Sequence, residues 1–526
     1  MPVEVKTKVE LPSTTTSYIK DDCFKDSLFY PYLFNSDNAE CYLDNAYDVI
    51  IKIKEILQQT KTPFSGILPH ELSQLFSKVN LDNPLSSWAS VLAELNQLYI
   101  KDAVYFHHPK YVAHLNCTLV LPAVIAEMLI GAINSSMDTW DQSAGATLIE
   151  QKVLDWTVDK LGLGKDADGI YTSGGTQSNF MAMLLARDWF CHQRDPQHKN
   201  LIHGLPDDFR KLRILTSSVS HFSTQKAAAM LGLGYQAIIS VPHDDKFCMS
   251  IDALEISIKQ CLAEGNIPFA VVATAGTTDF GSIDPLPAIA DLVKQYGLWM
   301  HVDAAYGCGL LVSSSHSNLL QGIEQADSVT IDYHKAFFQP VSCGSFFIKD
   351  RQHFCHLTYH ADYLNPLSAE QEKIPNLVNK SIQTTRRFDA LKMWLTLRMM
   401  GAEQLGLAFD KVLDTAQIAY HLMVSNSNFE VVHQPVLSTL VFRFIPQQYL
   451  SQEQIDDLNA NIRKSLFREG DCIIAGTKIN GRQYLKFTFL NPLTERQHLL
   501  EIMNNIIQQG NFLLSDLALT NNTSFK

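Results

Sequence analysis

The chain has 526 residues, of which 46% are hydrophobic and 18% are charged, and its formal net charge at pH 7 is −13. This composition excludes a disordered or coiled-coil protein, and the length implies one large domain with one or two smaller ones. The acidic balance argues against nucleic acid as a partner, because phosphate binding needs clustered Lys and Arg.

Neither the N-terminus nor the longest apolar stretch predicts an association with membranes. Residues 1–8 have mixed charges and no apolar run of a secretory signal. The stretch 117–133 contains Pro122 and Glu127 and is too short and polar to span a bilayer. The ten cysteines form no Cys-x-x-Cys pair or zinc-ligand cluster, so we expect reduced thiols and no metal. A cytoplasmic protein without a membrane partner is expected.

The first part of the chain is predicted to be an N-terminal extension and helical segment, residues 1–109. Residues 1 to about 45 show no periodicity. From residue 46 to about 105, apolar residues such as Val49, Ile53 and Leu57 recur at helical spacing. Their apolar stripe would need another surface to cover it, such as a second subunit.

Residues 110–400 are predicted to form a large α/β domain. Strand patterns occur at 212–215, 269–274, 298–302 and 329–331. Helical patterns occur between them and before them, at 148–161, 178–186, 224–231 and 287–295. Alternation of this kind implies parallel strands joined by crossover helices.

Residues 401–526 are predicted to form a small C-terminal α+β domain. A long helix is expected at 402–423 and is followed by four strand patterns and two further helices. The strands are expected at 429–432, 437–444, 471–474 and 484–489, and the helices at 452–467 and 495–508. Strands and helices that are grouped in this way favour an α+β arrangement.

Two polar motifs follow predicted strands of the large domain. Asp303 lies in His-Val-Asp-Ala-Ala-Tyr-Gly after the strand at 298–302, and His334-Lys335 follows the strand at 328–331. Ligands of open α/β sheets bind at the carboxyl ends of strands. A lysine that bonds to an aldehyde and an aspartate that keeps a pyridine nitrogen protonated are what pyridoxal phosphate (PLP) requires of a protein. Each motif alone is also compatible with a strand end, a turn or an N-cap.

Three further loops complete the predicted PLP site, and each has a structural alternative. Residues 172–179, Thr-Ser-Gly-Gly-Thr-Gln-Ser-Asn, precede a helix whose free N–H groups would bind a phosphate, or they form a capped turn. His221 in Ser-His-Phe-Ser is placed to stack on the ring, or is a packed histidine. Thr274 in Ala-Thr-Ala-Gly-Thr-Thr is placed to bond the ring hydroxyl, or is a β former.

Two other classes of protein receive less support. An NAD-dependent oxidoreductase would need Gly-x-Gly-x-x-Gly with a ribose-binding acid, which this loop is not. A binding protein without catalysis would be expected to have lost Lys335 or Asp303, and both are present.

Taken in order, these motifs resemble those of the group II PLP-dependent amino-acid decarboxylases, which have the aspartate-aminotransferase fold type (PLP fold type I). The resemblance runs from about His107 into the C-terminal domain. It implies a mostly parallel sheet of the seven-stranded type. It also implies PLP as the cofactor and a homodimer with active sites at the subunit interface.

A closer resemblance is to the L-lysine decarboxylases of desferrioxamine-type siderophore pathways. The strings that carry it are at 102–109, 113–117, 134–143, 383–392, 475–478 and 485–488. The L-2,4-diaminobutyrate decarboxylases share several of them. The resemblance implies the conversion of L-lysine to cadaverine for siderophore biosynthesis, with L-ornithine, L-2,4-diaminobutyrate or an aromatic L-amino acid as the alternative substrates.

The resemblance assigns roles to the residues of these motifs. It implies that Lys335 binds PLP covalently, that Asp303 keeps the pyridine nitrogen protonated, and that His221 stacks over the ring and helps to hold the substrate carboxylate. Further contacts with PLP are expected from Gly175, Thr176, Thr274, Ala305, His334 and Thr385. Of these, Thr385 would reach the phosphate of the neighbouring subunit.

The preference for a basic substrate is expected to depend on Asp138. The aromatic decarboxylases have an aromatic side chain at this position, lent across the dimer, whereas here Asp138 and Asp141 flank Trp140. A carboxylate that pairs with a distal ammonium group discriminates strongly between substrates, but either carboxylate could instead cap a helix or a turn. His114 and Cys117 are further candidates for substrate contact.

One departure from the family concerns the group that protonates the substrate carbon. The aromatic decarboxylases place a catalytic tyrosine on a mobile loop shortly before Arg-Arg-Phe, where this chain has Leu377. Tyr359 lies earlier in the same predicted loop, residues 359–385, which we interpret as a lid. Tyr359 is therefore a candidate, with His221 and His334 as alternatives.

Overall fold

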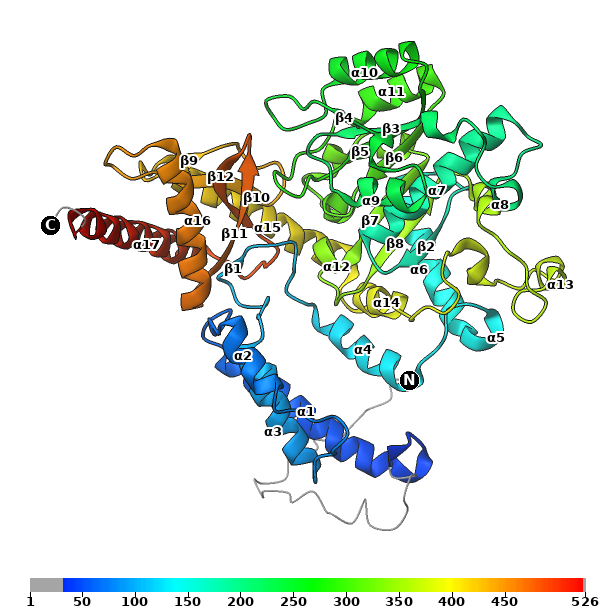
Figure 1. Ribbon diagram of the computed structural model, residues 1–526. Helices are drawn as coiled ribbons and strands as arrows, with labels where there is room; N and C mark the ends of the chain where they lie inside the picture. Colours follow the sequence, from blue (N-terminus) through cyan, green and yellow to red (C-terminus); the bar gives the residue numbers. More distant parts are fainter. Residues whose placement is uncertain (1–31, 524–526) are drawn as a thin grey trace. The chain divides into compact units, whose positions relative to one another are not determined.

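The computed structural model describes residues 32–523, with side chains described up to Ser515 (Figure 1). Most of the extension expected at residues 1 to about 45 lies outside these residues. The chain forms two compact units that divide between Val104 and Tyr105. No helix within the described residues combines the length and apolar character that a membrane crossing needs.

From residue 32 onwards the N-terminal unit is helical, as its apolar spacing predicts. They are α1 (Ala39–Gln59), α2 (Pro69–Phe76) and α3 (Trp88–Leu98). Pro69 opens α2, where the lack of a backbone N–H leaves no bond unmade. Ser87 caps α3 by accepting a hydrogen bond from the N–H of Ser90. α1 exposes six large apolar side chains, Tyr42, Leu43, Tyr47, Ile50, Ile53 and Leu57.

The second unit contains a seven-stranded sheet with the order β2-β8-β7-β6-β5-β3-β4. Its strands are β2 (Asp168–Thr172), β3 (Leu212–Ser217), β4 (Ile238–Val241), β5 (Ile267–Thr274), β6 (Trp299–Asp303), β7 (Ser328–Asp332) and β8 (Gly344–Ile348). Strands β4, β3, β5, β6 and β7 pair in parallel, and β8 is antiparallel to β7 and β2. The mostly parallel α/β sheet and its four predicted strands are therefore confirmed.

The unit has eleven α-helices before residue 401. They are α4 (Leu121–Ile133), α5 (Trp140–Ser143), α6 (Gly145–Leu161), α7 (Gly175–Arg194), α8 (Asn200–His203), α9 (Ser223–Met230), α10 (Ile251–Ala263), α11 (Leu286–Tyr296), α12 (Tyr333–Ala336), α13 (Leu367–Gln371) and α14 (Ala390–Met399). Among them, α6, α7, α9, α10, α11 and α12 pack against the strands of the sheet. Large side chains from the strands, among them Phe269, Trp299 and Phe346, are fully buried. The sheet is thus rigidly packed, which fixes the positions of its strand ends.

A five-stranded sheet with the order β1-β11-β12-β10-β9 lies in the same unit. Four of its strands come from the C-terminal part: β9 (Phe429–Val431), β10 (Thr439–Phe444), β11 (Ile473–Ile479) and β12 (Arg482–Thr488). They are accompanied by α15 (Gly401–Val424), α16 (Gln452–Glu469) and α17 (Arg496–Thr523). The fifth strand, β1 (Tyr111–Val112), pairs in parallel with β11 and was not predicted from the sequence.

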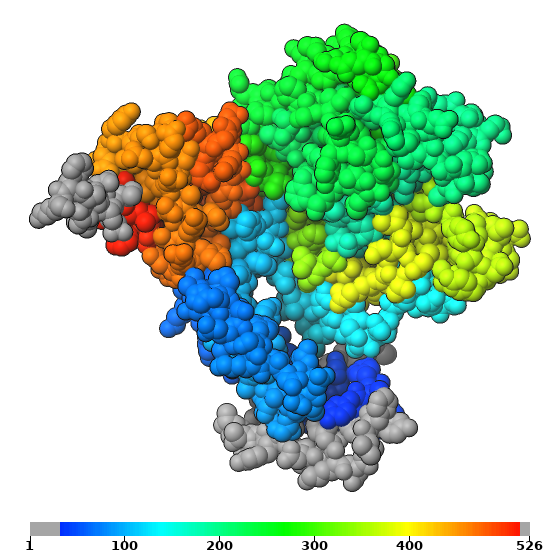
Figure 2. Space-filling model, viewed as in Figure 1, coloured from blue at the N-terminus to red at the C-terminus, as the bar shows by residue number. Residues whose placement is uncertain are grey.

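The two sheets are joined by contacts just beyond the central strands of the larger one. The Tyr306 hydroxyl lies 2.8 Å from Ser438 Oγ and 2.9 Å from Thr439 Oγ1, and it accepts a hydrogen bond from the N–H of Ser438 at 3.0 Å. At Gly276, where φ is 104°, a Cβ would lie 2.8 Å from Leu437. The C-terminal residues, in orange, accordingly abut the central ones, in green (Figure 2).

A substitution of Gly406 in α15 tests how tightly this helix packs on the segment after β6. A Cβ at Gly406 would overlap the carbonyl oxygen of Val312. We therefore expect Gly406→Ala to lower the free energy of unfolding by about 1–3 kcal/mol and to lower the Tm in thermal unfolding. Gly145→Ala is the matched control, because a Cβ at this helical glycine meets nothing within 4 Å. Equal Tm values for the two variants would contradict the close packing.

Candidate active site

The carboxyl ends of β5, β6 and β7, which are neighbours in the sheet, carry Thr274, Asp303 and Asp332 as their last residues. Helix α12, with His334 and Lys335, begins directly after β7. A cavity of about 320 Å³ lies at this edge. It is lined by residues that include Gly174, Gly175, Thr176, Asn179, His221, Thr274, Asp303, Ala305, Asp332, His334 and Lys335. The prediction that the two polar motifs follow strands is confirmed.

The amino group of Lys335 lies beside the carboxylate of Asp332. The distance from Lys335 Nζ to Asp332 Oδ2 is 3.1 Å, and the two side chains are 21% and 3% exposed. Burial lowers the pKa of Lys335, but the nearby carboxylates of Asp332 and Asp303 outweigh this effect and raise the pKa overall. Lys335 is therefore an ammonium ion at neutral pH when it has no covalent partner.

The carboxylate of Asp303 is held by hydrogen bonds from two directions. The Nδ2 of Asn179 donates to Oδ2 at 2.7 Å, and the backbone N–H of Ala305 donates to Oδ1 at 3.1 Å. The Asn179 side chain is oriented in turn, because its Oδ1 accepts a hydrogen bond from the Thr330 hydroxyl at 2.7 Å. Both Asn179 and Thr330 are buried.

A buried histidine extends this arrangement behind Asn179. His301 Nε2 lies 2.9 Å from Asn179 Oδ1, which can only accept, so Nε2 carries the proton. Burial lowers the pKa of His301 to about 4, so the ring is neutral and its Nδ1 accepts from the Ser328 hydroxyl at 2.9 Å. The Ser328 oxygen in turn accepts from Trp299 Nε1 at 2.9 Å. The donors of this chain therefore all point towards Asp303.

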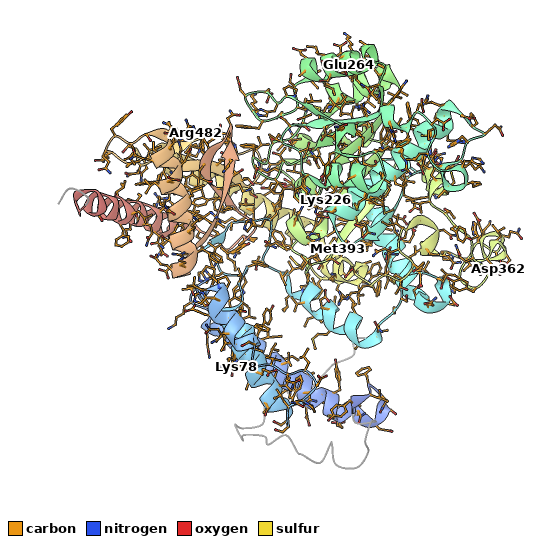
Figure 3. The ribbon with its side chains drawn as sticks, in the orientation of Figure 1. Lys78, Lys226, Glu264, Asp362, Met393 and Arg482 are labelled. Carbon is orange, nitrogen blue, oxygen red and sulfur yellow. The ribbon has the colours of Figure 1, made fainter. Side chains whose placement is uncertain are left out.

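His221 lines the cavity from the loop after β3, and Thr274 lines it from the end of β5. Burial lowers the pKa of His221, so its ring is neutral at neutral pH. Its Nδ1 accepts a hydrogen bond from the N–H of Ser223 at 3.2 Å, which places the ring proton on Nε2. Thr274 Oγ1 lies 3.1 Å from Ser220 Oγ. In Figure 3, Lys226 marks α9, the helix that begins just after His221.

The glycine loop at 172–179 forms the beginning of α7, as predicted. Gly174 has a φ of 142°, and a Cβ there would lie 3.2 Å from His334 Cε1. The N–H groups in the first turn of a helix have no acceptor within the helix, and the dipole favours an anion. The His334 ring is fixed beside this turn, because its Nδ1 lies 3.1 Å from the backbone nitrogen of Cys343.

These residues fit PLP. One cavity joins a lysine for the aldehyde, a carboxylate for the ring nitrogen and a helix start for the phosphate. Replacing Gly174 would narrow the helix start through the same contact with His334, so the small residues of the loop have a spatial reason. Among residues 32–523, no group of three or more His, Cys, Asp or Glu side chains is arranged to hold a metal ion.

Five residues predicted for the site are not among those that line the cavity of the single chain: His114, Cys117, Asp138, Tyr359 and Thr385. Cys117 is buried and donates a hydrogen bond to the carbonyl oxygen of His334 at 3.2 Å, so it lies behind α12. Burial raises the pKa of its thiol to about 12. His114 and Thr385 are exposed. The roles expected for these five residues stay predictions.

Asp138 is 4% exposed and accepts a hydrogen bond from the Ser136 hydroxyl at 2.8 Å. The segment around it is held by residues from before α14. Arg386 donates to the carbonyl oxygen of Met137 at 3.0 Å, and the N–H of Trp140 donates to Asn376 Oδ1 at 3.0 Å. The residue at the cap position of α5 is Thr139, so neither Asp138 nor Asp141 occupies it.

The predicted lid at 359–385 contains α13 and a short 3-10 helix, Leu377–Lys380. Asn365 links its two ends, because its Nδ2 donates to the carbonyl oxygen of Tyr359 at 2.8 Å and to Asn379 Oδ1 at 2.6 Å. The Tyr359 side chain is 82% exposed. Figure 3 places Asp362 of the same segment at the outer edge of the molecule.

Three residues of the site were not singled out from the sequence: Asn179, His301 and Asp332. Asn179 and His301 lie inside strings that the sequence analysis quoted, and Asp332 lies between the predicted strand at 328–331 and His334-Lys335. Their signal was a polar side chain at a position where the surrounding pattern predicts burial, because a buried polar group needs a partner. The identity of that partner could be known only from the fold.

The model of a family described as the pyridoxal-dependent decarboxylase conserved domain matches residues 69–445. The chain is 39% identical over 434 residues to an L-2,4-diaminobutyrate decarboxylase of Acinetobacter baumannii, a match that covers 81% of this chain and 85% of that protein. It is 42% identical over 404 residues to an L-2,4-diaminobutyrate decarboxylase of Rhizobium meliloti (strain 1021), which covers 77% of this chain and 78% of that protein.

A solved structure of a related decarboxylase also matches this chain. It is the glutamate decarboxylase domain of diaminobutyrate-pyruvate transaminase and L-2,4-diaminobutyrate decarboxylase from Vibrio parahaemolyticus. The TM-score is 0.81 at 38% identity, and the match covers 89% of this chain and 95% of the other. The chain therefore belongs to the group II pyridoxal-dependent decarboxylases and is a PLP-dependent amino-acid decarboxylase.

Proposed function

We propose that this enzyme removes the α-carboxyl group of a basic L-amino acid, with L-2,4-diaminobutyrate as the first candidate and L-lysine as the second. The first candidate is supported by the two relatives named L-2,4-diaminobutyrate decarboxylases, which match 81% and 77% of this chain. The assignment of L-lysine as substrate, with cadaverine as the product for siderophore biosynthesis, is supported only by the sequence strings described above. L-ornithine is intermediate in length between the two.

The observation that carries the assignment of the site is the meeting of Lys335, Asp303 and His221 in one cavity. When bound, PLP supplies an aldehyde carbon that bonds to the substrate nitrogen and a cationic ring that accepts the electron pair left by departing carbon dioxide. Lys335 would hold the cofactor through its amino group until the amino group of a substrate takes its place. Asp303, whose carboxyl oxygens accept two hydrogen bonds from the protein, would keep the ring nitrogen protonated.

His221 is proposed to cover the ring and to orient the substrate carboxylate. Its lowered pKa keeps the imidazole uncharged, and its Nε2 proton is free to be donated. Three residues are candidates for returning a proton to the substrate carbon. His221 and His334 line the cavity, whereas Tyr359 is exposed. Because His334 is fixed by Cys343, we favour His221 for this step.

A homodimer is proposed because α4 presents an apolar face. Its exposed side chains include Leu121 and Ile133, which are 72% and 70% exposed, together with Ile125, Met128 and Leu129. Exposed apolar surface of this extent on one helix is typical of a contact between proteins. A second subunit on this face would also account for Asp138 and Thr385, which the sequence predicts to serve the site of the partner.

Product analysis tests the substrate. Enzyme loaded with PLP is incubated with L-2,4-diaminobutyrate, L-lysine, L-ornithine, L-glutamate and L-tyrosine, and the amines are identified by mass spectrometry. We expect amines from the basic substrates, with the highest kcat/KM for L-2,4-diaminobutyrate. Lys335→Ala should form no amine and bind no cofactor covalently. A higher kcat/KM for L-lysine would reverse the two candidates, and turnover of only L-glutamate or L-tyrosine would contradict the basic class.

Asn179→Ala tests the support of Asp303. Loss of a hydrogen bond to a charged group costs about 1.5–3 kcal/mol, so we expect the affinity of the apoenzyme for PLP to fall at least about tenfold in a fluorescence titration. Thr330→Val is the matched control, since it removes a hydrogen bond one step further from Asp303 and should have a smaller effect. An unchanged affinity in Asn179→Ala would show that Asp303 does not depend on it.

Asp138→Ala tests substrate recognition. Removing a carboxylate that pairs with the distal ammonium group should raise the KM for the basic substrate about tenfold or more, while the affinity for PLP stays unchanged. Asp141→Ala is the control for a neighbouring carboxylate. Hybrids of Asp138→Ala and Lys335→Ala subunits should regain activity at low substrate concentration if Asp138 serves the partner's site. An unchanged KM would refute the role of Asp138.

A further inference from the structure

Asp332 is a buried carboxylate whose place in the cavity has no role in the account above. It ends β7, and its side chain is 3% exposed. Its Oδ2 lies 3.1 Å from Lys335 Nζ and 3.6 Å from His334 Nε2. Its Oδ1 is buried and has no hydrogen-bond partner. Burying a carboxylate costs free energy unless it is compensated, so this position calls for an explanation.

The structural explanations for Asp332 do not account for it. The residue stands at the cap position of α12, but its side chain makes no capping hydrogen bond. The carboxylate is also confined by glycine backbones. A Cβ at Gly344 would lie 2.7 Å from its Oδ1, and one at Gly175 would lie 3.1 Å from its Oδ2. The carboxylate is therefore fixed, and the nearest cation available to it is the ammonium group of Lys335.

We propose that Asp332 is a positioning residue that holds the amino group of Lys335 in the cavity as an ammonium ion whenever this group is not bonded to the cofactor. Asp332 thereby sets how fast Lys335 captures the cofactor at a given pH. The inference rests on the proposed function, in which Lys335 is the lysine that bonds to PLP.

The capture step shows why the charge of Lys335 matters. The lone pair of neutral Nζ forms a bond to the aldehyde carbon, and the carbonyl oxygen leaves as water with the two protons of the amine. An ammonium group has no lone pair and must first release one proton to the solvent. A carboxylate at 3.1 Å favours the ammonium form, so it holds the side chain in place and slows capture at neutral pH.

Other ionisable groups face Lys335 from the elements packed around it. They are Asp303 at the end of β6, His221 after β3, His334 in α12 and Cys308 in the segment after β6. Asp303 also favours the ammonium form, but Asp332 is the carboxylate within ion-pair distance. Burial keeps the two histidines neutral and raises the pKa of the Cys308 thiol to about 12, so none of these three adds a charge at neutral pH.

The test measures capture rather than turnover. Apoenzyme is mixed with PLP between pH 6.5 and 9.5, the absorbance of the bound cofactor is followed in a stopped-flow instrument, and borohydride reduction with peptide mapping locates the bond. The wild-type rate should rise with pH across this range. Asp332→Asn should capture about tenfold faster at pH 7.5 and show a weaker dependence on pH. Asp332→Glu, which keeps the charge, should retain the slope of the wild type.

Asp327→Asn is the matched control. Asp327 immediately precedes β7, whereas Asp332 ends this strand and Lys335 lies in α12 beyond it, and Asp327 accepts a hydrogen bond from the N–H of Met300 at 2.7 Å. Its replacement should leave the capture profile unchanged. The same experiment with pyridoxal, which has no phosphate, should reproduce the effect of Asp332→Asn. An effect seen with PLP but not with pyridoxal would mean that Asp332 acts on the phosphate, and it would overturn the proposal.

If Asp332→Asn does not fold, a measurement on the wild-type apoenzyme still tests the proposal. Labelling of amines by acetic anhydride as a function of pH should show Lys335 reaching half-maximal reactivity at a higher pH than the exposed Lys464. A lower value for Lys335, or equal capture profiles for the wild type and Asp332→Asn, would overturn the proposal. If borohydride instead fixes the cofactor to a residue other than Lys335, it is the proposed function of the site that fails.

Discussion

The position of the Asp303 carboxylate depends on a hydrogen bond from Asn179, and therefore on where the helix that carries Asn179 packs. Asn179 lies in α7 and Asp303 ends β6, so the bond forms only when the helix is seated on the sheet. Behind Asn179, three hydrogen bonds run in the same direction: Trp299 donates to Ser328, Ser328 donates to His301, and His301 donates to Asn179. Because each group in this chain is buried, a gap anywhere would leave an unsatisfied polar atom. The carboxylate therefore has one stable place.

The charges in the cavity follow from the same geometry. Parallel strands deliver their last residues to one edge, and here two of these residues are carboxylates that flank one lysine. Burial and the two carboxylates act in opposite directions on Lys335, and the carboxylates dominate. The histidines respond to burial and stay neutral. The cavity thus contains a charged lysine beside carboxylates and, in addition, histidines that can donate a proton while they are neutral.

In the large sheet, the sequence predicted β3, β5, β6 and β7 and missed β2 and β4, and it also missed β8, although β8 is buried along its whole length. β5 and β7 are apolar runs that end in a polar residue, so their type and their ends could be predicted. β2 contains Asp168 and Gly169, which are poor strand formers, and the edge strand β4 is only partly buried. β1 has two residues and exists only through its pairing with β11. Such strands are determined by tertiary contacts.

The candidate site divides in the same way. Residues at strand ends, such as Asp303 and Lys335, could be placed because the topology of a parallel sheet brings these ends together. Asn179 and Asp332 were missed, since what they contact depends on the seating of α7 and on the glycines around them. Asp138 and Tyr359 lie outside the cavity of one chain, on segments whose surroundings no local pattern specifies.

The pairing of β1 with β11 has a consequence for the order in which the chain can fold. β1 precedes the whole seven-stranded sheet in the sequence, whereas its partner follows it. On a ribosome, the strands of the large sheet can assemble while Tyr111 and Val112 still lack their neighbours. The five-stranded sheet can be completed only after β11 has been made, and closing so long a loop is slow. The small sheet can therefore be completed only after every strand of the large sheet has been made.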